Sequence, residues 1–135
     1  MGKIEGSVGR GAASASFDYD FAVEGGAVGA ITLRGESGKL PDNACIVGAW
    51  IEAITTPTSG GAATIRLGYT GNDNALLADT AFNHASYTAG NVTAATAELP
   101  LKLDAANGVN LIATVATAAL TAGRFRVHVQ YIPGA

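Results

Sequence analysis

The sequence predicts an all-β protein, an antiparallel β-sandwich of about eight strands with a jelly-roll-like topology. The residues of 124–131 alternate between polar and apolar, which is the pattern of a half-buried strand. Short segments of this kind recur along the chain, separated by links rich in Gly, Pro, Asn and Asp, and no segment has the pattern of a 12-residue amphipathic helix. An immunoglobulin-like sandwich is the second choice, because a chain with a single cysteine lacks that fold's Cys-Trp-Cys hallmark.

The first 16 residues differ in composition from the rest of the chain. Gly, Ala and Ser dominate them, and large apolar side chains are almost absent. This composition predicts a flexible N-terminal arm over residues 1–16 and a single β-sandwich domain over residues 17–135.

The first half of the domain contains four predicted strands. Alternation predicts strands over 17–23 and 28–33, with a turn at 24–26. After the turn-rich stretch 35–43, residues 44–55 predict a long strand. The break at 56–61 and the alternation of 63–69 favour a hairpin between that strand and the next.

The second half is less regular before it ends in clear strands. Residues 71–74 predict a loop, 75–82 fit either a strand or a helical turn, and 83–96 contain one weak strand near Val92. A short strand over 99–103 and a tight turn ending at Asn107-Gly108 lead to a strand over 109–115. Residues 118–123 then connect to the final strand.

The final strand has two different faces. We expect Phe125, Val127, Val129 and Tyr131 to face the core. The other face presents a polar row, which we expect to meet solvent or a partner and to catalyse nothing: Arg124, Arg126, His128 and Gln130.

Composition narrows the class of protein. The chain has 135 residues, a net charge of -3 and only 14% charged residues, without a basic patch that would recommend nucleic acid as a partner. No apolar stretch approaches the roughly 20 residues of a membrane span, and no signal-peptide core is present at the N-terminus. Because so few residues are charged, many Ala, Gly and Thr residues must face outward, which favours packing against other subunits.

Few residues suggest metal binding. His84 and His128 would need carboxylates from elsewhere to hold zinc, and two solvated histidines are the simpler interpretation. Asp18 and Asp20 share a strand face about 7 Å apart, a spacing that fits calcium or a glycosidase pair but is commoner for surface carboxylates. The run at 72–74 lacks the terminal Glu of a calcium loop.

Catalytic and cofactor motifs are also missing. The glycines at 6, 9 and 11 do not form a phosphate-binding loop, and no nucleophile elbow occurs. Cys45 fits a buried, inert thiol, and Trp50 fits a core or subunit-interface anchor better than a platform for a sugar. We therefore expect no cofactor, and an enzyme is the least supported class.

Several segments together resemble the capsid decoration, or cement, proteins of tailed bacteriophages. They are AVGAITL at 27–33, LPDNACIV at 40–47, SGGAATIRLG at 59–68 and LTAGRFRV at 120–127. The resemblance implies a small β-sandwich subunit, commonly trimeric, that binds the outside of a phage head and braces the shell. It implies a major capsid protein and further copies of this chain as partners, a location on the virion surface after assembly in the host cytoplasm, and no catalytic residues.

Within that interpretation, the N-terminal arm is the expected contact segment. We expect it to order against a capsid or a neighbouring subunit, through Lys3, Ile4, Val8 and Arg10. The alternative is a carbohydrate- or receptor-binding β-sandwich of a phage tail assembly, and a small hydrolase is a third option.

Overall fold

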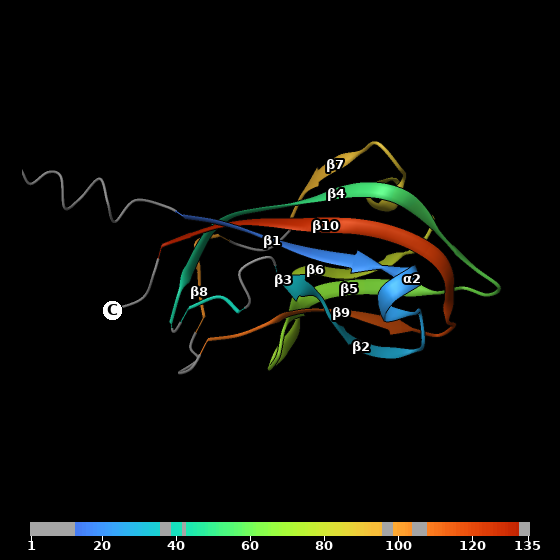
Figure 1. Ribbon diagram of the computed structural model, residues 1–135, viewed down its shortest axis with the longest axis horizontal. Helices are drawn as coiled ribbons and strands as arrows, with labels where there is room; N and C mark the ends of the chain where they lie inside the picture. The colour runs from blue at the N-terminus through green and yellow to red at the C-terminus, as the bar shows by residue number, and fades with distance from the viewer. Residues whose placement is uncertain (1–12, 36–38, 42, 96–98, 104–107, 133–135) are drawn as a thin grey trace, which may run out of the picture.

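The fold is a two-layer, antiparallel β-sandwich. The computed structural model describes residues 13–35, 39–41, 43–95, 99–103 and 108–132. Figure 1 shows the two sheets as upper and lower layers with the core between them, as the sequence predicted. Among the described residues, no helix is long and apolar enough to cross a membrane.

Sheet A is the larger layer. Its strands run in the order β3-β1-β10-β4-β7, and β8 also pairs with β4. Their bounds are Ala13–Asp20 for β1, Arg34–Gly35 for β3, Cys45–Ser59 for β4, Val92–Ala94 for β7, Leu101–Lys102 for β8 and Leu120–Ile132 for β10.

Sheet B has the order β2-β9-β5-β6. The bounds are Gly29–Thr32 for β2, Thr64–Tyr69 for β5, Asn72–Ala81 for β6 and Leu111–Ala116 for β9. Two single turns of helix complete the described elements, α2 at Phe21–Glu24 and the 3-10 turn η1 at Ala85–Tyr87.

The strand pairs are nested, and this nesting confirms the jelly-roll prediction. The first strand pairs with the last (β1 with β10), and β2 pairs with β9. Inside these, β4 pairs with β7 and β8, and β5 pairs with β6. Such nesting is what a long antiparallel hairpin produces when it rolls into two sheets.

The core is formed by the inward faces of both sheets. Phe125, Val127 and Val129 on β10 are each 1% exposed, which confirms their assignment, while Tyr131 is half-buried at the end of the strand. The ring of Phe125 packs between those of Tyr19 and Tyr87, with centroids 5.1 and 5.4 Å away. Aromatic pairs at these separations add to the gain from burial.

The first strand begins and ends earlier than expected. β1 starts at Ala13, so residues 13–16, which the sequence analysis assigned to the arm, pair with residues 128–131 of β10. Small side chains do not prevent this, because the backbone ladder and the long partner strand determine the pairing. β1 ends at Asp20 because that carboxylate accepts a hydrogen bond from Ala22 N (3.0 Å) and caps α2.

The predicted hairpin between 44–55 and 63–69 is wrong. β4 continues through Pro57 to Ser59, and the chain then crosses to the other layer, where β5 pairs with β6 and β9. Residues 72–74, predicted as a loop, begin β6, and the turn is shorter, with Gly71 at φ 109°. The ambiguous stretch 75–82 is mostly strand, as β6 runs to Ala81.

Candidate functional site

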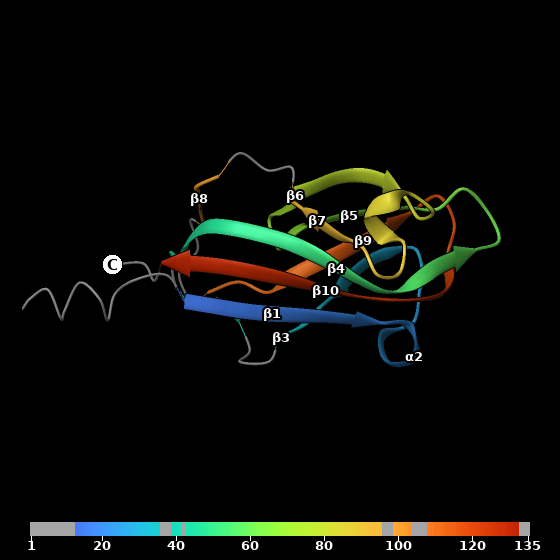
Figure 2. The same ribbon diagram turned by 90° about the horizontal axis from the view of Figure 1, so that it is seen from above.

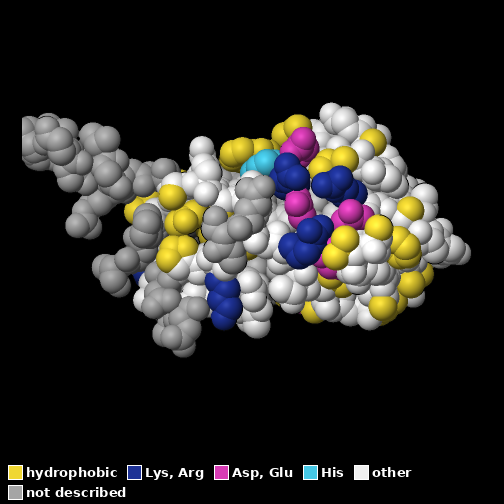
Figure 3. Space-filling model, in the orientation of Figure 1, with side chains coloured by type: hydrophobic (Ala, Val, Ile, Leu, Met, Phe, Trp, Pro, Cys, Tyr) yellow, Lys and Arg dark blue, Asp and Glu magenta, His cyan; other side chains and the backbone are white. Residues whose placement is uncertain are grey.

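The outer face of sheet A carries a cluster of charged side chains. Basic and acidic side chains are interleaved there in one group, with a histidine at its side and hydrophobic side chains next to it (Figure 3). Three members of the polar row pair with acidic residues of the flanking strands. Arg126 Nε lies 2.6 Å from Asp18 Oδ1, and Arg124 Nε lies 4.0 Å from Asp20 Oδ2.

One rung of this face has alternating charge across four strands. Arg34 on β3 is opposite Asp18 on β1, which is opposite Arg126 on β10, which is opposite Glu52 on β4. Cross-strand pairs of opposite charge stabilise a sheet. Arg34 also binds Glu24 of α2. The face is therefore charged but internally neutralised.

His128 connects three strands at the centre of this face. Its Nε2 lies 2.8 Å from Glu52 Oε1, and its Nδ1 lies 3.3 Å from the Ser16 hydroxyl. The imidazole also stacks on Trp50, with ring centroids 5.4 Å apart and an interplanar angle of 15°. Trp50 is therefore half-buried on the outer face. The prediction that it anchors the core is wrong, and the prediction that it anchors a subunit interface stays a prediction. Alternation explains this position, since Ala49 and Ile51 on either side face the core.

The line Ser16-His128-Glu52 contains the residue types of a hydrolase triad but not its arrangement. In such triads the carboxylate holds Nδ1 and the serine hydroxyl meets Nε2, next to donors for the oxyanion. Here the two nitrogens are exchanged. None of the three hollows described below is lined by these residues. The geometry therefore gives no support to a hydrolase.

Each carboxylate of the described residues lies within 4.0 Å of a basic side chain, which is an arginine for all of them except Glu52, whose partner is His128. Outside sheet A, Arg66 on β5 binds both Asp73 and Asp79, at 2.9 and 3.1 Å. Hydrogen bonds to Asp73 and then Asp79 raise the pKa of the Arg66 guanidinium. Asp18 and Asp20 share a face of β1 but face different arginines. Asp18 is hydrogen-bonded to Arg126, and Asp20 lies 4.0 Å from Arg124 Nε, beyond hydrogen-bond distance.

The other predicted site residues that the structure describes take no part in this polar group. Within the described ranges, no group of three His, Cys, Asp or Glu residues could hold a metal ion. His84 caps η1, where its Nδ1 accepts a hydrogen bond from Ser86 N at 3.1 Å. Cys45 is half-buried at the start of β4 instead of fully buried. Lys3, Ile4, Val8 and Arg10 lie outside the described residues.

Two buried tyrosines lie under this arrangement. Burial, with smaller effects from Glu24 and Asp20, raises the pKa of Tyr19 to about 12. The Tyr19 hydroxyl donates to Gly25 O at 2.6 Å. Burial also raises the pKa of Tyr87, whose hydroxyl donates to Ile65 O at 3.3 Å. Both groups have structural partners, so neither is available as an acid or base.

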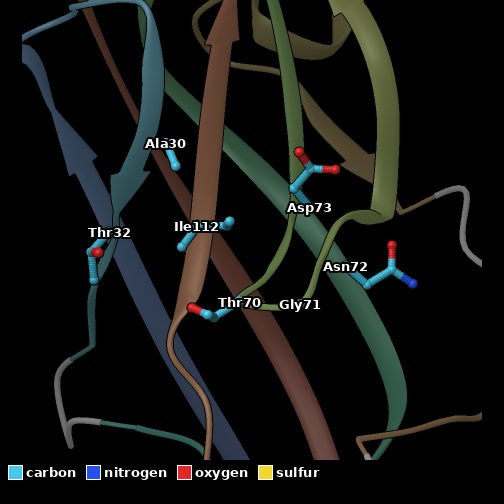
Figure 4. A pocket seen from close by; sticks show the side chains of 7 residues that line it. All are labelled: Ala30, Thr32, Thr70, Gly71, Asn72, Asp73 and Ile112. Carbon is cyan, nitrogen blue, oxygen red and sulfur yellow. The ribbon is translucent and has the colours of Figure 1, made fainter.

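The described surface has three hollows of a size that could hold a ligand. The largest, of about 570 Å³, lies on sheet B (Figure 4) and is lined by Ala30, Thr32, Thr70, Gly71, Asn72, Asp73 and Ile112. Its single carboxylate, Asp73, is already bound to Arg66. The other two have volumes of about 350 and 260 Å³. None combines an apolar interior with converging polar groups that lack partners, which is the usual form of a small-molecule site.

Comparisons with known proteins supply the remaining observation. No protein-family model and no curated protein matches this chain. Solved structures do match. A chain of the cyanophage Pam1 capsid asymmetric unit aligns with a TM-score of 0.61 at 21% identity, over 92% of this chain and 87% of that one. The protein shares its fold with chains of phage capsid structures.

Two further phage capsids give the same result. A chain from the acid-stable capsid of Helicobacter pylori bacteriophage KHP30 aligns with a TM-score of 0.59 at 19% identity, covering 90% of this chain and 86% of that one. A chain from the capsid of Ralstonia phage GP4 aligns with a TM-score of 0.58 at 24% identity, covering 92% and 85%. The likeness extends over nearly the whole jelly roll.

Proposed function

We propose that this chain is a structural protein of a phage virion, which binds the outside of the capsid as a decoration subunit and stabilises the shell. The observation that carries the proposal is the shared jelly roll, which matches chains of three phage capsid structures. Because a fold alone does not define a function, the surface and the sequence must agree with it.

The coverage of the alignments supports a separate small subunit. In each comparison at least 85% of the matched chain is covered as well as 90% or more of this one. The matched chains are therefore similar in length to this protein. A jelly roll of this size is the form expected of a decoration subunit that is added to a shell.

The surface is suited to being buried in an assembly. Unpaired charges are costly to remove from water, whereas paired and hydrogen-bonded charges cost less. The chain is only 14% charged, and the described carboxylates pair with arginines within it, except Glu52, which is hydrogen-bonded to His128. This pairing supports a role in packing against other subunits.

The proposal names partners and a location. The partners are the major capsid protein and further copies of this chain, as a homotrimer on the capsid surface, after assembly in the host cytoplasm. The residues before β1 make part of the contact, through Lys3, Ile4, Val8 and Arg10. The proposal includes no catalytic residue, cofactor, nucleic acid or membrane.

The test uses phage heads assembled without this protein. Heads from a phage with the gene deleted are incubated with the purified full chain, sedimented, and imaged by electron cryomicroscopy. We expect added density on the outer surface and heads that resist a higher temperature before releasing DNA. Failure to sediment with heads, or density only at the neck or tail, would refute the decoration role.

A sugar-binding module is the second candidate, because Trp50 lies on the outer face beside hydrogen-bonding side chains. Aromatic rings in such positions can stack on sugars. A glycan array probed with the full chain, with Trp50→Ala as the control, separates the two functions. Binding that is lost in the variant would favour the tail module.

A further inference from the structure

An apolar strip runs along β4 on the outer face of sheet A. Of the five large hydrophobic side chains that are exposed among the described residues, three belong to it: Val47 at 37%, Val92 at 66% and Ile132 at 42%. We define the β4 strip as Cys45, Val47, Trp50, Val92, Ala94 and Ile132.

Strand register makes the strip continuous. Trp50 is opposite Ala94 on β7, and Cys45 is opposite Ile132 on β10. Val92 is opposite Glu52, one step further along β4 on the same face. Val47 lies where the register of β4 and β10 shifts, and it is exposed there. From Cys45 to the level of Val92 the strip extends about 23 Å at the usual rise per residue.

The chemistry of the strip defines its occupant. No residue of the strip is charged. Lys102 on β8 is opposite Cys45 at one end of the strip, where its Nζ donates to Asn43 O at 3.2 Å. The neighbouring polar row has its charges matched by Asp18, Asp20 and Glu52. An occupant therefore needs apolar side chains rather than a net charge. An apolar surface of this extent, bordered by polar residues, is typical of an interaction site.

The chain itself supplies a segment of the right length. Twelve residues precede Ala13, enough to extend about 40 Å. They include Ile4 and Val8, which in an extended chain share a face with Gly6 and Arg10, while Lys3, Glu5, Ser7 and Gly9 share the other.

The place where this segment joins the domain favours binding to another copy. Ala13 pairs with Tyr131, at the same end of sheet A as the Cys45 and Ile132 end of the strip. Figure 2 shows β1 starting at that end and running away from it, toward α2. A segment that continues the direction of β1 leads away from its own domain, and reaching its own strip requires a reversal.

We propose that residues 1–12 of one copy bind the β4 strip of a second copy, with Ile4 and Val8 against its apolar side chains. The proposal rests on the self-association included in the proposed function and identifies the surface that receives the segment. The contact made by Ile4 and Val8 requires no ionic partner, so screening of charges by salt should not weaken it.

The test uses Trp50, the single tryptophan of the chain, as a reporter within the strip. Emission of the full chain is measured over a dilution series beside its mass by analytical ultracentrifugation. Dilution should dissociate the assembly and shift the emission to longer wavelength over one concentration range. Ile4→Glu with Val8→Glu should raise the dissociation constant at least about tenfold, the effect of one lost buried aliphatic contact. Ser7→Glu should leave it unchanged.

A matched pair of variants tests the strip. Val92→Glu should weaken association to the same extent, whereas Val23→Glu, at a valine of similar exposure (62%) outside the strip, should not. Emission that responds to the Ile4 and Val8 changes but not to dilution would mean that the segment binds its own domain, and would overturn the proposal. A monomer whose emission responds to neither would also overturn it.

The two proposals fail in different ways. Intact association without binding to phage heads would refute the decoration role alone. Binding to heads by a chain whose association does not depend on Ile4, Val8 or Val92 would refute the strip contact alone.

Discussion

A single added carbon at Gly68 should destabilise the fold strongly. Gly68 lies on β5 with the backbone of β6 pressed against it. A Cβ atom placed there would lie 2.2 Å from Asn72 O and 2.5 Å from Asp73 C. These are backbone atoms, so no side chain can rotate away.

The size of the effect follows from this geometry. Ordinary contact requires about 3.4 Å, so β6 must move by at least about 1 Å in Gly68→Ala. Overpacking of this kind costs about 1–3 kcal/mol, and losing a ladder hydrogen bond beside the turn costs about 1 kcal/mol more. We expect a loss of about 3 kcal/mol in the free energy of unfolding, or roughly 10 °C in Tm.

Urea unfolding, followed by far-UV circular dichroism at one protein concentration, measures the change. The matched control is Gly60→Ala, because a Cβ at Gly60 has no atom within 4 Å. The control should stay within about 0.5 kcal/mol of the parent chain. If Gly68→Ala behaves like Gly60→Ala, the close packing of β5 against β6 is wrong.

Three further predictions concern the charged face and the core. Asp18 and Arg126 have side chains only 15% and 29% exposed, so a double-mutant cycle to Ala should give a coupling energy of about 1 kcal/mol. Tyr19 has its pKa raised from 10.0 to about 12, so its contribution to stability is complete below pH 10 and is lost as the pH rises toward 12. When the free energy of unfolding in urea is measured over a pH series, Tyr19 contributes at most about 1.4 kcal/mol per pH unit to its decrease. This contribution should disappear in Tyr19→Phe. Phe125→Leu removes two aromatic contacts from the core, at 5.1 and 5.4 Å, and should cost about 2 kcal/mol in the same assay.

Each of these predictions has a contradicting outcome. Additive effects of the Asp18 and Arg126 changes would mean that the two side chains do not interact. If the free energy of unfolding falls as steeply above pH 10 in Tyr19→Phe as in the parent chain, the Tyr19 hydroxyl does not have a raised pKa. A Phe125→Leu chain as stable as the parent would place that ring outside the core.

Local pattern predicted most elements, and it failed where pairing between distant strands decides the outcome. The inward face of the final strand was predicted correctly because alternation is a property of its own residues, and Phe125, Val127 and Val129 are buried as expected. Its start was not, because β10 begins at Leu120, within the predicted connection 118–123. The hairpin with 63–69 was wrong, because nothing local tells a turn within a sheet from a crossing between layers. Residues 13–16 have no strand pattern, yet each of them pairs with a residue of β10, in the stretch 128–131.

The same distinction applies to the functional face. The sequence places the polar row on one side of a strand, but its partners come from β1 and β4, about 76 to 112 residues away along the chain. Trp50 looked like a core residue because its neighbours are apolar, and only the register of β4 shows that it faces outward beside His128.

The sequence by itself determined the all-β class, the jelly-roll-like sandwich, the core face of the final strand and a surface poor in charge. These depend on side-chain periodicity and composition, which are local. Only the tertiary structure decided which strands share a sheet, how the charges of sheet A are paired and where the β4 strip lies. Those features arise from hydrogen-bond ladders between residues far apart in the sequence, where a shift of one residue would exchange the inner and outer faces.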